Sequence, residues 1–290
     1  MLSLITRNTI FIGAMAVGAI VGGLLAPWTV SARGAFGPTI LQAQSVPLAV
    51  LAAVISLAVC TGLAVLVCRV CNPAVAMFSL GGGLFGLAWR MEGAQELMHS
   101  GSFALLPIES VLWALAVFGA TVIVFKLGGP MRDVDPDTTG RVHDGLFSLA
   151  ALKAAAPGVL VLPVVWVLAQ SPMKGQMIGS VFVGAMVAGL LGRVLSPHVQ
   201  PLLLFASPVL FGAIGQWIGI ATLGASPVDA WVAKAFPHLL LPMPVDYAAA
   251  SMMGVAFGLG LAKSSVHHEQ PSAQSAESAR SAEPAPRPRV

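Results

Sequence analysis

The chain has 290 residues, of which 57% are hydrophobic and only 9% are charged. Roughly 25% of the residues in an ordinary soluble domain are charged, so this composition excludes that class. The formal net charge of +3 is small, and we expect no nucleic-acid partner. The composition predicts an all-α polytopic protein that contacts the lipid bilayer, since helices are the only open structure that satisfies its backbone in lipid.

Eight apolar stretches predict spanning helices, each of which needs about 20 mainly apolar residues. The first follows Arg7 and is longer than the apolar core of a signal peptide, which predicts a retained helix. The fifth contains Pro157 and Pro163, and these predict a kinked helix inside the bundle. The predicted spans are Ile10–Trp28, Pro47–Cys68, Pro73–Trp89, Pro107–Lys126, Ala154–Ala169, Met177–Gly192, Leu202–Leu223 and Val245–Ala262.

Lys and Arg are distributed unevenly between the two sides that eight spans define. Eleven of them fall on the side of the two termini, and only four fall on the other side. Because positive residues favour the cytoplasmic side, both termini are predicted to be cytoplasmic, in a bacterial-type inner membrane. The four on the opposite side are Arg33, Arg90, Lys174 and Lys234.

Two similar strings lie between consecutive predicted spans: CRVCNPAV at residues 68–75 and GRVLSPHV at residues 192–199. In each, an Arg ends one helix, and a polar residue followed by Pro is typical of the start of the next. Further matches follow in the same order along the chain. We infer a duplication of a four-helix unit, giving a 4+4 parallel repeat about an axis along the membrane normal.

The duplication predicts four parts of the chain. The tail is rich in Ser, Ala, Pro and Glu, a composition that cannot bury a core, so we expect it to be disordered. The four parts are the first transmembrane repeat at residues 1–127, a cytoplasmic linker at 128–153, the second transmembrane repeat at 154–263 and a cytoplasmic tail at 264–290.

Two acidic residues, Glu109 and Asp246, lie near the outer ends of the fourth and eighth predicted spans, each two residues after a Pro. Acids at membrane depth often mark a pathway for protons or cations. An acid in a first helical turn can instead complement the helix dipole. Arg69 and Arg193 leave a similar choice, because they can line an anion route or cap their helices and extend to the headgroups. All four are pathway candidates.

The linker contains a weak calcium-loop pattern. Four acids fall at positions 1, 3, 5 and 12 of the loop template, but position 6, which needs Gly, is Thr138. A solvated acidic linker is the favoured interpretation over a metal site, and we expect no cofactor. The four acids are Asp133, Asp135, Asp137 and Asp144.

Small residues recur at every fourth position in the first predicted span, which lets another helix approach closely. This stripe predicts close packing and offers a face for a protein partner or for a second copy of the chain. It consists of Ala14, Gly18, Gly22 and Ala26.

The chain lacks a phosphate-binding Gly loop, a nucleophile elbow and a zinc-binding helix motif, so the sequence favours a protein that is not an enzyme. The inferred duplication favours a small-solute or ion transporter or channel with a pathway between the two repeats. The alternative is a non-transporting accessory or scaffold subunit of a membrane complex, which the scarcity of charge inside the spans favours.

Overall fold

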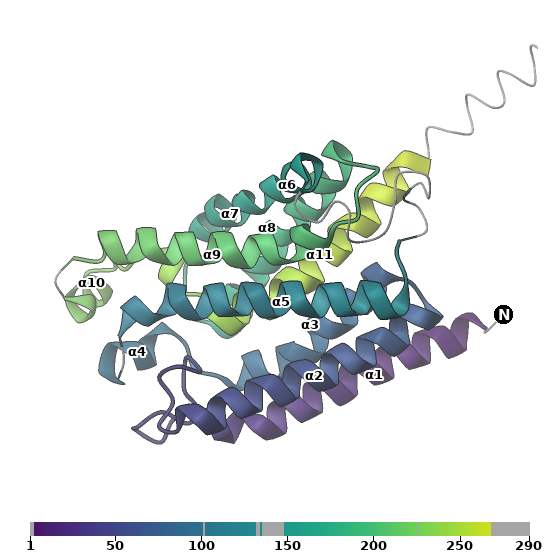
Figure 1. Ribbon diagram of the computed structural model, residues 1–290. Coiled ribbons are helices and arrows are strands. Elements are labelled where there is room, and N and C mark those ends of the chain that lie inside the picture. The colour runs from purple at the N-terminus through teal and green to yellow at the C-terminus, as the bar shows by residue number, and fades with distance from the viewer. Residues whose placement is uncertain (1–2, 101, 132–133, 135–147, 225, 268–290) are drawn as a thin grey trace, which may run out of the picture.

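The structure is a computed structural model, and it describes residues 3–100, 102–131, 134, 148–224 and 226–267. In this part of the chain the elements are helical, apart from an isolated β-bridge between Val30 and Phe36. The long helices run roughly along one direction (Figure 1). We call the end that holds the N-terminus the linker end, and the opposite end, with the short helices α4 (Ala94–Ser100) and α10 (Pro227–Val232), the loop end.

The two halves of the chain contain similar series of elements. The first half has α1 (Leu4–Leu25), a 3₁₀ turn at Ala26–Thr29, α2 (Val46–Val70), α3 (Pro73–Arg90), α4, a 3₁₀ turn at Phe103–Leu105 and α5 (Leu106–Gly128). The second half has α6 (Leu149–Ala155), a 3₁₀ turn at Ala156–Leu160, α7 (Val161–Leu168), α8 (Lys174–Leu195), α9 (Leu202–Thr222), α10, a 3₁₀ turn at His238–Leu240 and α11 (Pro244–His267).

Seven helices of the described chain are long and apolar enough to cross a membrane, which indicates an integral membrane protein. The helix α3, the third of the eight predicted spans, is not among them. It has only 18 residues, which include the run Gly81–Gly83, and it ends at Arg90. Its length of about 27 Å is close to the hydrocarbon thickness of roughly 30 Å.

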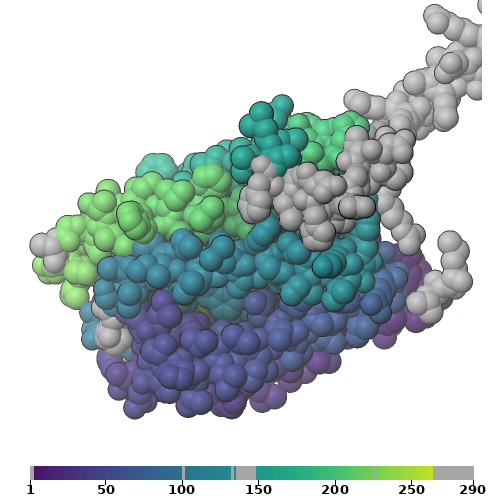
Figure 2. Space-filling model, viewed as in Figure 1, coloured from purple at the N-terminus to yellow at the C-terminus, as the bar shows by residue number. Residues whose placement is uncertain are grey.

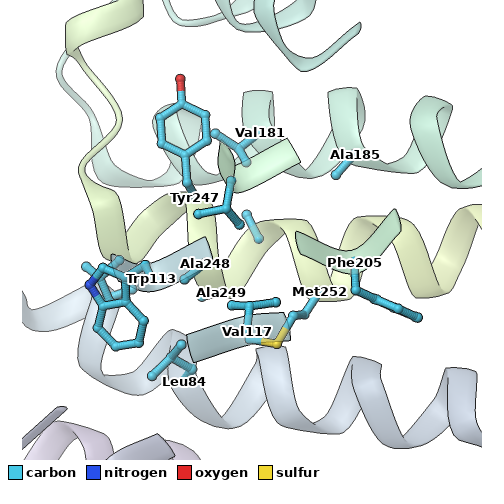
Figure 3. Packing of buried hydrophobic residues seen from close by; sticks show 14 of the residues in the cluster. Leu84, Trp113, Val117, Val181, Ala185, Phe205, Tyr247, Ala248, Ala249 and Met252 are labelled. Carbon is cyan, nitrogen blue, oxygen red and sulfur yellow. The ribbon is translucent and has the colours of Figure 1, made fainter. Parts of the chain in front are cut away.

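The central helix of the bundle is α11, the most buried of the seven candidate spans. It packs against α8, α3, α9 and α5. Figure 3 shows Tyr247, Ala248, Ala249 and Met252 of α11 among side chains of these neighbours, such as Val181 of α8. In lipid, helices associate through close van der Waals contact and interhelical hydrogen bonds rather than through hydrophobic exclusion. Small residues on α11 permit that close contact on several sides.

The outer surface of the bundle is apolar, as a lipid-facing surface must be. Figure 2 shows one face, on which α9, α5 and α2 lie side by side. Large hydrophobic side chains are exposed along these helices, including Leu51, Leu115, Ile123, Leu210 and Ile214.

The fifth predicted span is interrupted, as its prolines predict. It consists of α6, the 3₁₀ turn that contains Pro157, and α7. A Cβ atom added at Gly158 of this turn would overlap the Ser207 hydroxyl of α9, so the broken helix approaches α9 very closely. The interruption therefore forms a contact inside the bundle.

A second proline removes one backbone hydrogen bond from a helix that continues on both sides of it. Pro208 lies inside α9 and has no N–H to donate to the carbonyl of Leu204, one turn earlier. The Ser207 hydroxyl donates to this same oxygen over 3.2 Å. A neighbouring side chain thus satisfies the carbonyl that the proline leaves free, as a helix in lipid requires.

The small-residue stripe of α1 packs inside the chain, against α3. Ala14, Gly18, Gly22 and Ala26 are all buried. A Cβ atom added at Gly18 would lie 2.9 Å from the Cα atom of Gly83, and one at Gly22 would lie 2.8 Å from the Leu87 nitrogen. The close packing predicted from the stripe is therefore present, and its partner is a helix of the same chain.

The close contact between α1 and α3 predicts that a larger residue at Gly86 destabilises the protein. A Cβ atom added there would overlap the carbonyl oxygen of Ala19. We expect Gly86→Val to destabilise the protein by about 1–3 kcal/mol, because the backbones of α1 and α3 must separate. Gly62→Val is the matched control, since no atom lies within 4 Å of a Cβ added there. Thermal unfolding in detergent measures both, and equal midpoints for the two variants would contradict the packing described.

Candidate functional site

Glu109 lies in the first turn of α5 at the loop end and is only 2% exposed. Its two carboxylate oxygens accept hydrogen bonds from the backbone N–H groups of Ile40 and Leu41, each over 3.0 Å. Hydrogen bonds to an ionised acceptor are stronger than neutral ones. The carboxylate therefore anchors the loop before α2 to the start of α5.

Asp246 lies in the first turn of α11 and is fully buried. Its Oδ1 atom is 2.9 Å from the Nζ of Lys174, at the start of α8, and its Oδ2 accepts from the same Nζ over 3.0 Å. Oδ2 also accepts from the backbone N–H of Met243, just before α11, over 2.9 Å. The ammonium of Lys174 further donates to the carbonyl of Glu92, after α3. The ion pair thus joins α8 and α11 to the first half of the chain.

The two acids lie where the sequence predicts, at the starts of α5 and α11, but the structure gives them different partners. Backbone amides hold Glu109, whereas an ammonium group holds Asp246. From the sequence, Lys174 is predicted only to be one of the four Lys and Arg residues on the side opposite the termini. Its burial, with a side chain that is 14% exposed, is the feature that sequence reasoning missed. A buried acid requires a cation or several hydrogen-bond donors. This requirement indicates that the acid has a partner, but it does not indicate which residue the partner is.

Other contacts at the loop end join the two halves. The Ser110 hydroxyl of α5 donates to Gln216 Oε1 of α9 over 2.7 Å, and Gln216 Nε2 donates to the carbonyl of Pro242 over 3.3 Å. All of these groups are buried. The rings of Phe103 and Phe236 lie 5.8 Å apart, centroid to centroid, and connect the loops before α5 and α11. The loop end is thus closed by polar and aromatic contacts between the halves.

The turn between α2 and α3 at the linker end is as predicted. Asn72 caps α3 by accepting from the N–H of Val75 over 2.9 Å, and Pro73 is the first helical residue. Arg69 lies in the last turn of α2, is exposed, and donates through Nε to the carbonyl of Leu127 over 3.4 Å. It therefore caps α5 as well as ending α2.

The corresponding prediction for the second string is wrong. Arg193 does lie in the last turn of α8, where it is partly buried, but Ser196 does not cap α9. That helix begins at Leu202, after Pro201. A proline disfavours helical geometry in the residue before it, so a helix that began at Pro197 would be broken within its first turn.

A cavity of about 1040 Å³ lies at the linker end. It is bounded by α1, by the turn between α2 and α3, by the segment after α5, and by the last turns of α11. Three cationic residues line it: Arg7 of α1, Arg69 of α2 and Lys263 of α11. Exposed residues such as Asn72 also line it, so the cavity is open to the surroundings.

The four linker acids Asp133, Asp135, Asp137 and Asp144 lie outside the described residues. Among the residues that are described, no three His, Cys, Asp or Glu side chains cluster in a way that could hold a metal ion. Cys60, Cys68 and Cys71 are free thiols.

No family model matches the chain, and no curated protein or solved structure is significantly similar to it. Its function is therefore inferred from the arrangement of its own residues.

The contacts of Lys174 with Asp246 predict how substitutions of either residue change the free energy of unfolding. We expect Lys174→Met or Asp246→Leu alone to destabilise the protein by about 3–5 kcal/mol, because each leaves one buried charge without its partner. The double variant should lose less than the sum of the two. A double-mutant cycle from thermal unfolding in detergent measures the coupling.

The control for this cycle is the pair of Arg33 and Glu96, whose charged atoms are 3.7 Å apart and whose Arg side chain is 52% exposed. A pair of this kind contributes at most about 1 kcal/mol. If the pair of Lys174 and Asp246 showed equally weak coupling, it would not be a structural link between α8 and α11.

Proposed function

We propose that the chain is an eight-span protein of two four-helix repeats that transports a small solute or an ion along the interface between them. The order of the elements supports the repeat. In each half three long stretches of helix, a short helix and a 3₁₀ turn are followed by a final long helix that carries an acid in its first turn. In this arrangement α3 corresponds to α9, and α5 to α11.

The contacts between the halves also support the repeat. The main ones are between α3 and α11 and between α5 and α9. Exchanging α3 with α9 and α5 with α11 converts the first contact into the second, as a two-fold axis would do. The helices α5 and α11 contact each other, as helices next to such an axis would. A parallel repeat of this kind places transport sites at the interface of its units.

The observation that carries the transport proposal is the difference between the two ends of this interface. At the linker end, a cavity of about 1040 Å³ lies between the last turns of α11 and the first half, where α1, the end of α2, the start of α3 and the end of α5 line it. At the loop end, the hydrogen bond from Lys174 to the carbonyl of Glu92 and the contact between Ser110 and Gln216 close the interface. A pathway open at one end and closed at the other is what alternating access requires of each state.

The pathway candidates have distinct places in this proposal. Arg69 lies on the cavity wall, and Arg193 ends the corresponding helix of the second repeat. Glu109 and Asp246 lie at the closed end, where their hydrogen bonds must rearrange for it to open. The distribution of Lys and Arg supports an orientation with both termini and the cavity in the cytoplasm of a bacterial-type cell.

One observation favours the second candidate function, a non-transporting accessory or scaffold subunit. Glu109 and Asp246 are the only acids in the described spans, and both lie in first turns rather than at mid-membrane. Coupled transporters commonly carry an ionisable group near the middle of the bilayer. A partner would contact a face other than the stripe of α1, because α3 already covers that stripe.

Flux measurements test the transport proposal. We expect the purified protein in liposomes to carry proton or chloride flux above that of empty liposomes, and Arg69→Gln to lower it at least tenfold, because the wall of the open cavity loses a charge. Lys234→Gln, an exposed cation at the loop end, should stay within twofold of the native protein. No flux, together with reproducible co-purification of another membrane protein, would contradict transport and favour the accessory subunit.

Cysteine labelling tests the eight spans. In a chain with Cys60 and Cys68 replaced by Ala, native Cys71 lies just before α3, and Glu92→Cys would place a thiol just after it. If α3 crosses the membrane, an impermeant maleimide should label the two positions from opposite sides of sealed vesicles. His198→Cys and Arg33→Cys are controls for the linker and loop ends. Labelling of Cys71 and of position 92 from the same side would reduce the count to seven.

A further inference from the structure

The cavity at the linker end gathers positive charge from three separate helices. Arg7 of α1, Arg69 of α2 and Lys263 of α11 line it. Each is at least partly exposed, and the described residues that line the cavity include no Asp or Glu. In the described part of the chain, none of the three is within ion-pair distance of a carboxylate. Among the described residues, these three cations therefore form a basic site without a counter-charge.

The start of α3 adds to the positive potential. The residues from Asn72 to Val75 line the cavity, and they form the N-terminal turn of an 18-residue helix. The dipole of the helix makes this end partially positive, which favours an anion nearby. Pro73 has no N–H and the N–H of Val75 already donates to Asn72, so the contribution is that of the dipole rather than of several open N–H groups. The charged side chains and the helix end thus act in the same direction.

Most of the remaining cavity wall is apolar, and it reaches the outer surface of the bundle. Leu4, Arg7, Asn8 and Phe11 form one face of α1 in the cavity, since they are spaced by three or four residues. Phe11 lies against Phe78 of α3, with their ring centroids 6.0 Å apart. Two apolar residues of the wall, Leu4 of α1 and Phe257 of α11, are 72% and 47% exposed on the outer surface of the bundle. The cavity therefore joins a basic region to an apolar surface that acyl chains can reach.

We propose that this cavity binds a phosphate-bearing anion, with Arg7, Arg69 and Lys263 around the phosphate group. Two sources supply that chemistry: an anionic phospholipid of the adjoining leaflet, and a soluble phosphate compound. The apolar wall favours the phospholipid, because basic pockets between spanning helices on the cytoplasmic side bind acidic headgroups. The inference rests on the proposed function for the cytoplasmic placement of this end, but it concerns binding and not flux.

The test compares two triple variants that change the net charge equally. In the first, Arg7, Arg69 and Lys263 are each changed to Gln. In the second, Lys126, Lys153 and Lys234 are changed to Gln, three exposed lysines that do not line the cavity. Each protein, purified in neutral detergent, is titrated with phosphatidylglycerol and with phosphatidylcholine, and bound lipid is counted by native mass spectrometry. Inorganic phosphate and glycerol 3-phosphate are titrated separately by calorimetry.

We expect the native protein to bind phosphatidylglycerol saturably and phosphatidylcholine at least tenfold more weakly. The cavity variant should lose at least tenfold in affinity for phosphatidylglycerol, and the control variant less than twofold. If the soluble phosphates bind with the same dependence on the three cations, the site holds and its ligand is soluble. The proposal is overturned if the native protein binds none of these probes, or if the two triple variants lose affinity equally.

A single variant keeps the test valid if the triple cavity variant does not fold. Arg69 is exposed, so Arg69→Gln should leave the unfolding midpoint nearly unchanged and still weaken phosphatidylglycerol binding at least threefold. An unchanged affinity in this folded variant would count against the site. Because these readouts measure no transport, the site can be confirmed in a protein that carries no flux, and flux can be found in a protein without the site.

Discussion

The structure depends on one constraint: in lipid, each polar group of the backbone must find its partner inside the protein. The hydroxyl of Ser207 accommodates Pro208 in α9 by donating to the carbonyl that the proline leaves free. Glu109 satisfies two backbone N–H groups of a loop, and Asp246 is satisfied by an ammonium and one N–H group. The helices can therefore be nearly uniform in hydrophobicity, while a few polar contacts at their ends fix which helices are neighbours.

The position of α11 explains why glycines of α3 and α8 face it. It packs against helices from both halves of the chain, and a Cβ atom added at Gly81 of α3 would lie 2.6 Å from the carbonyl oxygen of Ala249. A Cβ atom added at Gly189 of α8 would lie 2.5 Å from the carbonyl oxygen of Val255. Backbones this close leave no room for large side chains between them. The last helix of the described residues is thus the one around which the others pack.

Much of this fold could be predicted from the sequence, because lipid restricts the options. Long apolar runs locate the helices, prolines locate the interruption of the fifth, and Asn72-Pro73 locates the start of α3. Pairings between helices could not be predicted in the same way. The stripe of α1 indicates close packing but not that α3 is its partner, because any small-residue face fits such a stripe.

The candidate site was only partly predictable for a related reason. The acids at the starts of α5 and α11 are apparent from their spacing after Pro107 and Pro244. Their partners come from residues far along the chain: Ile40 and Leu41 for one, Lys174 for the other. The apolar run predicts the start of α9 correctly at Leu202, but the cap predicted at Ser196-Pro197 is wrong, since the effect of Pro201 on the residue before it outweighs a favourable cap.

The way in which Glu109 holds its loop has an evolutionary consequence. Its carboxylate recognises main-chain N–H groups, which every amino acid except proline provides. At Leu41, which is only partly buried, many side chains are therefore compatible with the same anchorage, and proline alone removes a donor. Related chains could diverge widely in this loop while keeping its path, provided that the acid at the start of α5 is retained.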